Sequence, residues 1–178
     1  MAGFFSRFGK QQQPTPPSAP AGPAASEPAP AGSPAGVFDF FMGDHRACDL
    51  VWAEIEKDGG GAATPALFAR FDAVLRRHFA MEEEVMFPAF EQVSGMTGGG
   101  PTFVMRSEHE QMRGVLDQMA AAVAGGDVEE MLDLGDTLLM LVQQHNAKEE
   151  GILYPAADGM LGPQWAEMST KLQGYLAE

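Results

Sequence analysis

The sequence has little of several features that would point to common functional classes. Its 178 residues include one cysteine, Cys48, which excludes an intrachain disulfide framework and favours a reducing compartment. No apolar run approaches the roughly 18 residues that span a bilayer, and the first ten residues lack the long apolar segment of a secretory signal. Basic residues are also few: 11 Lys and Arg oppose 25 Asp and Glu, for a formal net charge of −14. Nucleic acid is disfavoured as a partner, since phosphate binding needs a basic face. We expect a cytoplasmic protein that is not transmembrane.

The first 36 residues differ in composition from the rest. Residues 14–36 contain eight of the thirteen prolines, with Ala, Gly and Ser filling nearly all other positions. Such a composition cannot bury enough apolar surface to offset its ordering entropy, so we expect a disordered tail over residues 1–36 and one domain over residues 37–178. Phe4, Phe5 and Phe8 could share one helical face, which makes residues 1–10 a candidate docking segment for a protein or a membrane surface. The alternative is a frayed terminus, because ten residues form a marginal helix alone.

Apolar periodicity and turn signals predict an all-α domain. Helices are expected over residues 38–57, 65–93, 102–124, 127–154 and 164–177, separated by glycine- and proline-rich breaks. No sustained apolar and polar alternation is present, so strands are not expected. Short connections imply antiparallel neighbours, and the second helix must bend or stop near Pro88 for the third to pack level with it.

A repeat carries the chemistry of the domain. The string His-x-Ala-x-Glu-Glu-x-x-x-aromatic-Pro begins at His78 and again at His145, 67 residues later, while His45 and His109 match at an offset of 64. The domain is therefore a helix hairpin used twice. Each histidine lies on the apolar stripe of its helix, where three- and four-residue steps mark the inward face.

The buried acids of this repeat need a positive partner. A carboxylate one turn after a histidine on an apolar stripe is costly to bury, and a metal ion would compensate it. The candidate ligands are His45, His78, Glu82, His109, His145 and Glu149. Imidazole and carboxylate without thiolate suit iron, manganese or zinc, and six ligands are too many for one tetrahedral zinc. Two metals sharing two bridging glutamates is the economical arrangement. The alternative is four buried histidines that pair with carboxylates for structure alone.

Neighbouring residues offer weaker candidates. Cys48 lies one turn from His45 and could bind metal or be oxidised, but its repeat counterpart is an apolar methionine, which favours packing. Glu83 could be a spare ligand, although a solvated face is favoured. Asp44 and Glu108 precede two of the histidines and are candidate acceptors for imidazole N–H groups.

The sequence resembles the hemerythrin-like (HHE cation-binding) domain family. The resemblance rests on His45, His78-x-x-x-Glu82-Glu83 with Phe87-Pro88, His109, and His145-x-x-x-Glu149-Glu150 with Tyr154-Pro155. It covers about residues 38–155 and implies an up-down antiparallel four-helix bundle, followed here by a short C-terminal helix, with a carboxylate-bridged site for two non-haem iron ions.

Two positions separate this chain from the oxygen-carrying hemerythrins. Their fifth histidine, four residues after the one that matches His109, is here Arg113. Their second bridging acid would be Glu150, whereas the internal repeat favours Glu149. With two histidines per metal, both irons should keep an open position, which weighs against simple O2 storage. We expect a di-iron protein that binds or reacts with O2, peroxide or NO in an oxygen, redox or iron response. A ferroxidase- or peroxidase-like enzyme and a reversible O2 carrier are the alternatives.

Overall fold

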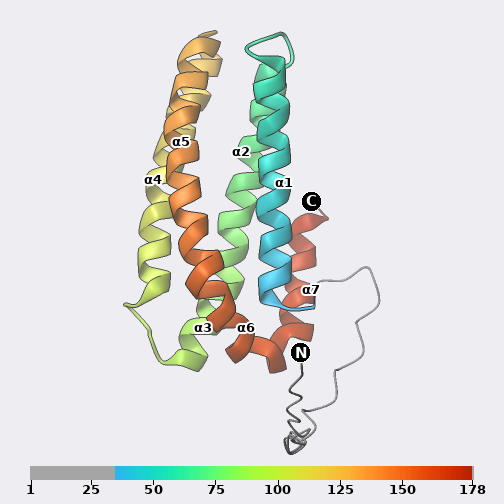
Figure 1. Cartoon of the computed structure of the whole chain (residues 1–178), viewed down its shortest axis with the longest axis vertical. Coiled ribbons are helices and arrows are strands. Elements are labelled where there is room, and N and C mark those ends of the chain that lie inside the picture. Colours follow the sequence, from blue (N-terminus) through green and yellow to red (C-terminus); the bar gives the residue numbers. More distant parts are fainter. Residues whose placement is uncertain (1–34, 178) are drawn as a thin grey trace, which may run out of the picture. The chain divides into compact units, whose positions relative to one another are not determined.

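The structure is a computed structural model that describes residues 35–177, and its regular elements are all helical (Figure 1). The predicted all-α class is confirmed for these residues, none of which forms a strand. Within the same range, no helix combines the length and apolarity needed to cross a membrane. The predicted docking segment, residues 1–10, and nearly all of the predicted disordered tail lie outside the described residues.

Four long helices make up most of the domain. They are α1 (Val37–Asp58), α2 (Thr64–Met81), α4 (Pro101–Ala124) and α5 (Val128–Lys148). Their ends follow local sequence signals. Gly59 adopts a left-handed conformation with φ 57° at the end of α1, where its N–H donates to the carbonyl of Ile55. Asp127 precedes α5 and accepts a side-chain hydrogen bond from the backbone N–H of Glu130 at 3.0 Å.

Two wide turns interrupt the helices that carry the repeat. After α2 comes the π-helical turn η1 (Glu82–Met86) and then α3 (Phe87–Ser94); after α5 comes η2 (Glu149–Leu153) and then α6 (Tyr154–Leu161). The predicted fourth helix therefore continues past residue 154 instead of ending there. A proline inside a helix lacks an N–H and crowds the carbonyl four residues earlier, and a widened turn just before it relieves that conflict. Each π-helical turn begins at one of the candidate glutamates and ends just before an aromatic-Pro pair.

The helices pack as two hairpins. Helix α1 contacts α2, α4 contacts α5, and α2 joins the two pairs through α4 (Figure 1). At one end, α3 and α6 contact each other, and α6 also packs on α1. The chain then forms η3 (Gly162–Gln164) and α7 (Trp165–Leu176), which packs against η1 and α2. Helix α7 corresponds to the predicted C-terminal helix.

The core consists of two apolar clusters separated by a polar layer. One cluster includes Phe41, Met105 and Tyr154, and the other includes Cys48 and Met112. On α1, the buried His45 lies between Phe41 of the first cluster and Cys48 of the second. On α4, the buried His109 lies between Met105 and Met112 in the same way. The apolar faces on both sides therefore exclude water from the layer that holds the candidate ligands.

Candidate metal centre

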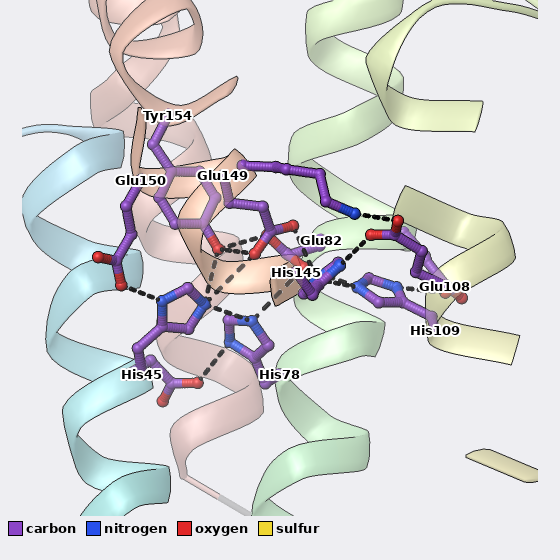
Figure 2. A network of polar contacts seen from close by, with 12 residues as sticks. His45, His78, Glu82, Glu108, His109, His145, Glu149, Glu150 and Tyr154 are labelled. Atoms are coloured by element: carbon purple, nitrogen blue, oxygen red, sulfur yellow. Dashed lines mark hydrogen bonds and ion pairs between the residues drawn. The ribbon is translucent and has the colours of Figure 1, made fainter. Parts of the chain in front are cut away.

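The six predicted ligands converge in this polar layer (Figure 2). They are His45 from α1, His78 from α2, Glu82 from η1, His109 from α4, His145 from α5 and Glu149 from η2. All six are buried, and Glu82, His109 and Glu149 have no exposed surface. The donor atoms form two overlapping groups, each within 4.8 Å: one of Glu82, His109, His145 and Glu149, the other of His45, His78 and Glu149.

Every histidine of the chain has its Nδ1 atom against a carboxylate. His45 Nδ1 lies 2.8 Å from Glu150, His78 Nδ1 2.9 Å from Asp44, His109 Nδ1 2.7 Å from Glu83, and His145 Nδ1 3.0 Å from Glu108. A carboxylate can only accept, so each Nδ1–H donates. The neutral ring then turns the lone pair of Nε2 towards the centre of the layer.

The four outer carboxylates were only partly expected. Asp44 and Glu108 occupy the role proposed for them from the sequence. The sequence favours a solvated face for Glu83 and leaves Glu150 as the alternative bridge. In the structure, each contacts an imidazole of the opposite hairpin. The missed signal was the repeat itself, because Glu83 and Glu150 are the second acids of the two Glu-Glu pairs.

The Nε2 atoms face each other in two pairs. His45 and His78 approach to 3.1 Å, and His109 and His145 approach to 3.0 Å. Two imidazole lone pairs at this distance repel each other unless a proton or a metal ion lies between them. Histidines that bind metals show the same arrangement: one ring nitrogen binds the metal and the other donates a hydrogen bond to a carboxylate.

The two buried glutamates connect the hairpins. One oxygen of Glu82 lies 3.5 Å from His78 Nε2 and 3.2 Å from His109 Nε2. Glu149 lies 3.4 Å from His45 Nε2 and 3.1 Å from His145 Nε2 through its two oxygens. Oε2 of Glu82 and Oε1 of Glu149 are buried and accept no hydrogen bond within the described part of the chain. Unsatisfied carboxylate oxygens beside converging imidazole nitrogens are a donor set that fits metal ions of the iron, manganese or zinc type.

Without metal, the cluster retains protons. Burial alone would lower the pKa of His45 and His109. Close contacts and negative charge from Glu149 and Glu150 outweigh this effect for His45, and those from Glu82 and Glu83 do so for His109, so both pKa values rise to about 9. For Glu149, burial opposes ionisation, yet the close imidazoles of His145 and His45 hold its pKa well below the usual range. These protons must leave when a metal binds.

Cationic residues stabilise three of the four outer carboxylates. Arg77 contacts Asp44 at 3.0 Å, and Lys148 contacts Glu108. Arg113 donates to both oxygens of Glu83 at 2.9 Å. Burial opposes ionisation of Glu83, but its bonds to His109 and Arg113 lower its pKa to about 2. Arg113 also lies 5.2 Å from the centre of the Phe79 ring. Arg113 therefore fixes the position of Glu83, the carboxylate that contacts His109. Arg113 itself lies one helical turn after His109, at the position of the fifth histidine described above.

The hydroxyl of Tyr154 lies inside the cluster. Its oxygen is 2.7 Å from Glu82, 2.8 Å from Glu149 and 3.0 Å from His45 Nε2. Burial and the two negative carboxylates raise the pKa of Tyr154 well above its usual value. The motif predicts only an aromatic residue at this position, and the signal for a polar role is that the second copy has tyrosine where the first has phenylalanine.

Two further features border the centre. Cys48 packs in the apolar cluster beyond the histidines, where burial and the charge of Asp44 raise the pKa of its thiol to about 12. It belongs to neither group of candidate donors. A groove of about 430 Å³ lies between α1 and α5, with Trp52 and Val142 among its walls and Glu150 at its edge. Since Glu150 contacts His45, the Glu150 side chain separates solvent in this groove from the cluster.

Comparison with known proteins agrees with this site. The profile described as the hemerythrin HHE cation-binding domain matches residues 36–157. The chain belongs to the hemerythrin HHE cation-binding domain family. It is 25% identical over 131 residues to a DNA nickase from Nostoc sp. (strain PCC 7120), a match that covers 74% of this chain and 36% of the relative. The chain thus aligns with about a third of that protein's length. No solved structure matched.

Proposed function

We propose that this chain is a non-haem di-iron protein of hemerythrin type that binds or reacts with O2, peroxide or NO. The centre would lie inside an up-down antiparallel four-helix bundle. One iron is held by His45 and His78 and the other by His109 and His145, with Glu82 and Glu149 bridging them. The single observation that supports this most is the pairing of Nε2 atoms at 3.0 and 3.1 Å beside carboxylate oxygens that accept no hydrogen bond from the described residues. This arrangement is unfavourable without a shared cation.

Glu149 is the better candidate than Glu150 for the second bridge. Glu149 is fully buried between His45 and His145, whereas Glu150 is about one third exposed and reaches the outer Nδ1 of His45. An outer carboxylate on a ligating histidine raises its basicity and fixes its orientation, which is a role distinct from bridging.

Bound iron would supply electrons to a small oxidant, or a position for a diatomic ligand. The residues of the chain would hold the two ions in register, exclude bulk water through the apolar clusters, and fix each imidazole through its outer carboxylate. Reaction with excess Fe(II) and oxidant over many cycles would indicate a ferroxidase- or peroxidase-like enzyme. Reversible binding would indicate a carrier, and a single change of redox state would fit a sensor.

The test is to load the protein with Fe(II) without oxygen, count irons per chain, and then admit O2 while recording the optical spectrum. Two irons per chain that oxidise to a stable coupled ferric pair are expected. A spectrum that reverts when O2 is removed would restore the carrier. Binding of zinc or manganese in place of iron would keep the site and refute the iron assignment.

Variants separate the metal centre from a structural role of the histidines. His145→Gln should lose about one iron per chain, whereas Gln144→Ala, at the exposed position next to it, should load like the wild type. A chain that folds and binds no metal, with His145→Gln affecting stability alone, would establish the metal-free scaffold instead.

Three further points concern nucleic acid, location and docking. DNA nicking, named for the Nostoc relative, is disfavoured for this chain because a net charge of −14 opposes binding to phosphate. A cytoplasmic location is proposed because the chain has a single cysteine, which suits a reducing compartment. Docking through residues 1–10 would be tested by deleting residues 1–36, which should leave iron loading unchanged and remove any partner interaction.

A further inference from the structure

The two halves of the cluster are alike in histidines and glutamates but differ in one aromatic residue. The repeat places Tyr154 in one half and Phe87 in the other. The Tyr154 ring lies 5.5 Å from the His45 ring, and the Phe87 ring lies 5.8 Å from the His109 ring. The aromatic rings therefore occupy comparable positions, and the hydroxyl of Tyr154 has no counterpart in the other half.

The position of this hydroxyl is that of a donor atom. Two donors at right angles around one metal, each about 2.1 Å from it, are about 3 Å apart. The Tyr154 oxygen lies 3.0 Å from His45 Nε2, 2.7 Å from Glu82 Oε1 and 2.8 Å from Glu149 Oε2. The contact between His45 and His78 Nε2, at 3.1 Å, falls in the same range. The distances from the Tyr154 oxygen to the proposed ligands of one half are therefore similar to the distance between the two histidines of that half.

We propose that the hydroxyl oxygen of Tyr154 is a ligand of the metal held by His45 and His78, so that the open position belongs to the metal held by His109 and His145. This inference rests on the proposed di-iron function. When the oxygen binds the metal, its O–H bond breaks, the proton passes to solvent, and no electron is transferred. The donor count becomes five on the Tyr154 side and four on the Phe87 side. A water-derived oxygen shared by the two ions would raise these counts to six and five, which leaves one open position, on the Phe87 side.

The asymmetry has a chemical consequence. An anionic phenolate is a hard oxygen donor that iron accepts in other proteins, and it favours Fe(III) over Fe(II) by its charge. The iron beside Tyr154 is therefore the one with fewer exchangeable positions, while the iron beside Phe87 receives the small ligand. A two-site centre with one open side differs from the symmetric centre that the sequence repeat alone suggests.

Resonance Raman and optical spectra of the ferric protein test the assignment directly. The full chain is loaded with Fe(II) without oxygen, oxidised with ferricyanide, and its irons are counted. Tyrosine ring modes enhanced by a phenolate-to-Fe(III) transition are expected in the wild type and should be lost in Tyr154→Phe. The same substitution should weaken metal binding at that half by about tenfold or more.

The chain supplies its own control, because it contains only two tyrosines. Tyr175 lies in α7, and its hydroxyl donates to Glu84 at 2.6 Å, so Tyr175→Phe should keep the ring modes. Azide, added to the ferric wild type as a probe of open positions, should bind with a stoichiometry of one per chain.

The outcomes separate this inference from the function on which it rests. Two irons per chain without tyrosine ring modes in the wild type would overturn the Tyr154 assignment and leave the di-iron centre intact, even if Tyr154→Phe failed to fold. Two azide ions per chain, or none, would overturn the single open position. A chain that binds no iron would refute the proposed function and the inference together.

Discussion

Replacing Asp44 with asparagine tests whether the outer carboxylates act on the metal through the histidines. Asp44 is 7% exposed, accepts from His78 Nδ1 at 2.9 Å and contacts Arg77 at 3.0 Å. Burial opposes its ionisation, yet the hydrogen bond from His78 and the charges of His78 and Arg77 hold the pKa of Asp44 below the usual range. Asparagine keeps an acceptor oxygen for His78, removes the negative charge, and presents an N–H donor on the side of Arg77.

The expected loss follows from the role of this contact. A carboxylate on the far nitrogen of a ligating histidine increases the basicity of the nitrogen that binds the metal, and its loss lowers metal affinity by about 10- to 100-fold, or about 1.4 to 2.7 kcal/mol. Removing a charge-assisted hydrogen bond from a buried site should also lower the free energy of unfolding of the metal-free protein by about 1 to 3 kcal/mol. Glu108→Gln, the repeat counterpart, should fall in the same ranges.

The assay is competition for zinc with a chromogenic chelator, which avoids redox chemistry. Asp72→Asn is the matched control, because it makes the same change in net charge but Asp72 contacts Arg76 at 2.7 Å and no histidine. Its zinc affinity should stay within about twofold of the wild type, because Asp72 contacts Arg76 and not a candidate ligand. Equal losses in the two variants, or none in Asp44→Asn, would refute the argument.

Two other predictions concern packing and protons. Gly135→Ala places a Cβ 2.3 Å from the Trp52 ring and should cost about 1 to 3 kcal/mol of unfolding free energy in urea titrations. Gly114→Ala, which meets nothing within 4 Å, should instead gain about 0.5 to 1 kcal/mol; the opposite order would contradict the structure. The raised pKa values of His45 and His109, about 9, stabilise the metal-free fold fully below the unfolded histidine pKa of about 6.5. This stability should be lost as the pH rises from about 6.5 through 9, while zinc affinity increases; a flat profile for both would count against the protonated cluster.

Much of the site could be predicted because the repeat and the helical period are local properties of the chain. Steps of three and four residues place His78 and Glu82 on one face of a helix wherever that helix packs. The second copy places His145 and Glu149 in the same way. Buried acids on such a stripe already require compensation, so a candidate metal centre could be proposed from the sequence before any helix was positioned.

The sequence did not predict the widened turns. Pro88 suggested a bend, but the π-helical turn that begins at Glu82 depends on how the proline and its neighbours are accommodated in a continuous helix. The same applies to the turn before Pro155, after which α6 continues to Leu161. Those turns set the direction of the two glutamates and of the aromatic residues that follow them.

The sequence by itself determined the helical class, the two hairpins and the six side chains that face inward. Only the tertiary structure decided which carboxylate meets which imidazole, and that the hydroxyl of Tyr154 enters the cluster while Glu150 stays outside it. The physical reason is geometric. Periodicity fixes the face on which a residue lies, whereas contacts between helices depend on their rotation and height relative to one another, and these follow from packing of the whole core.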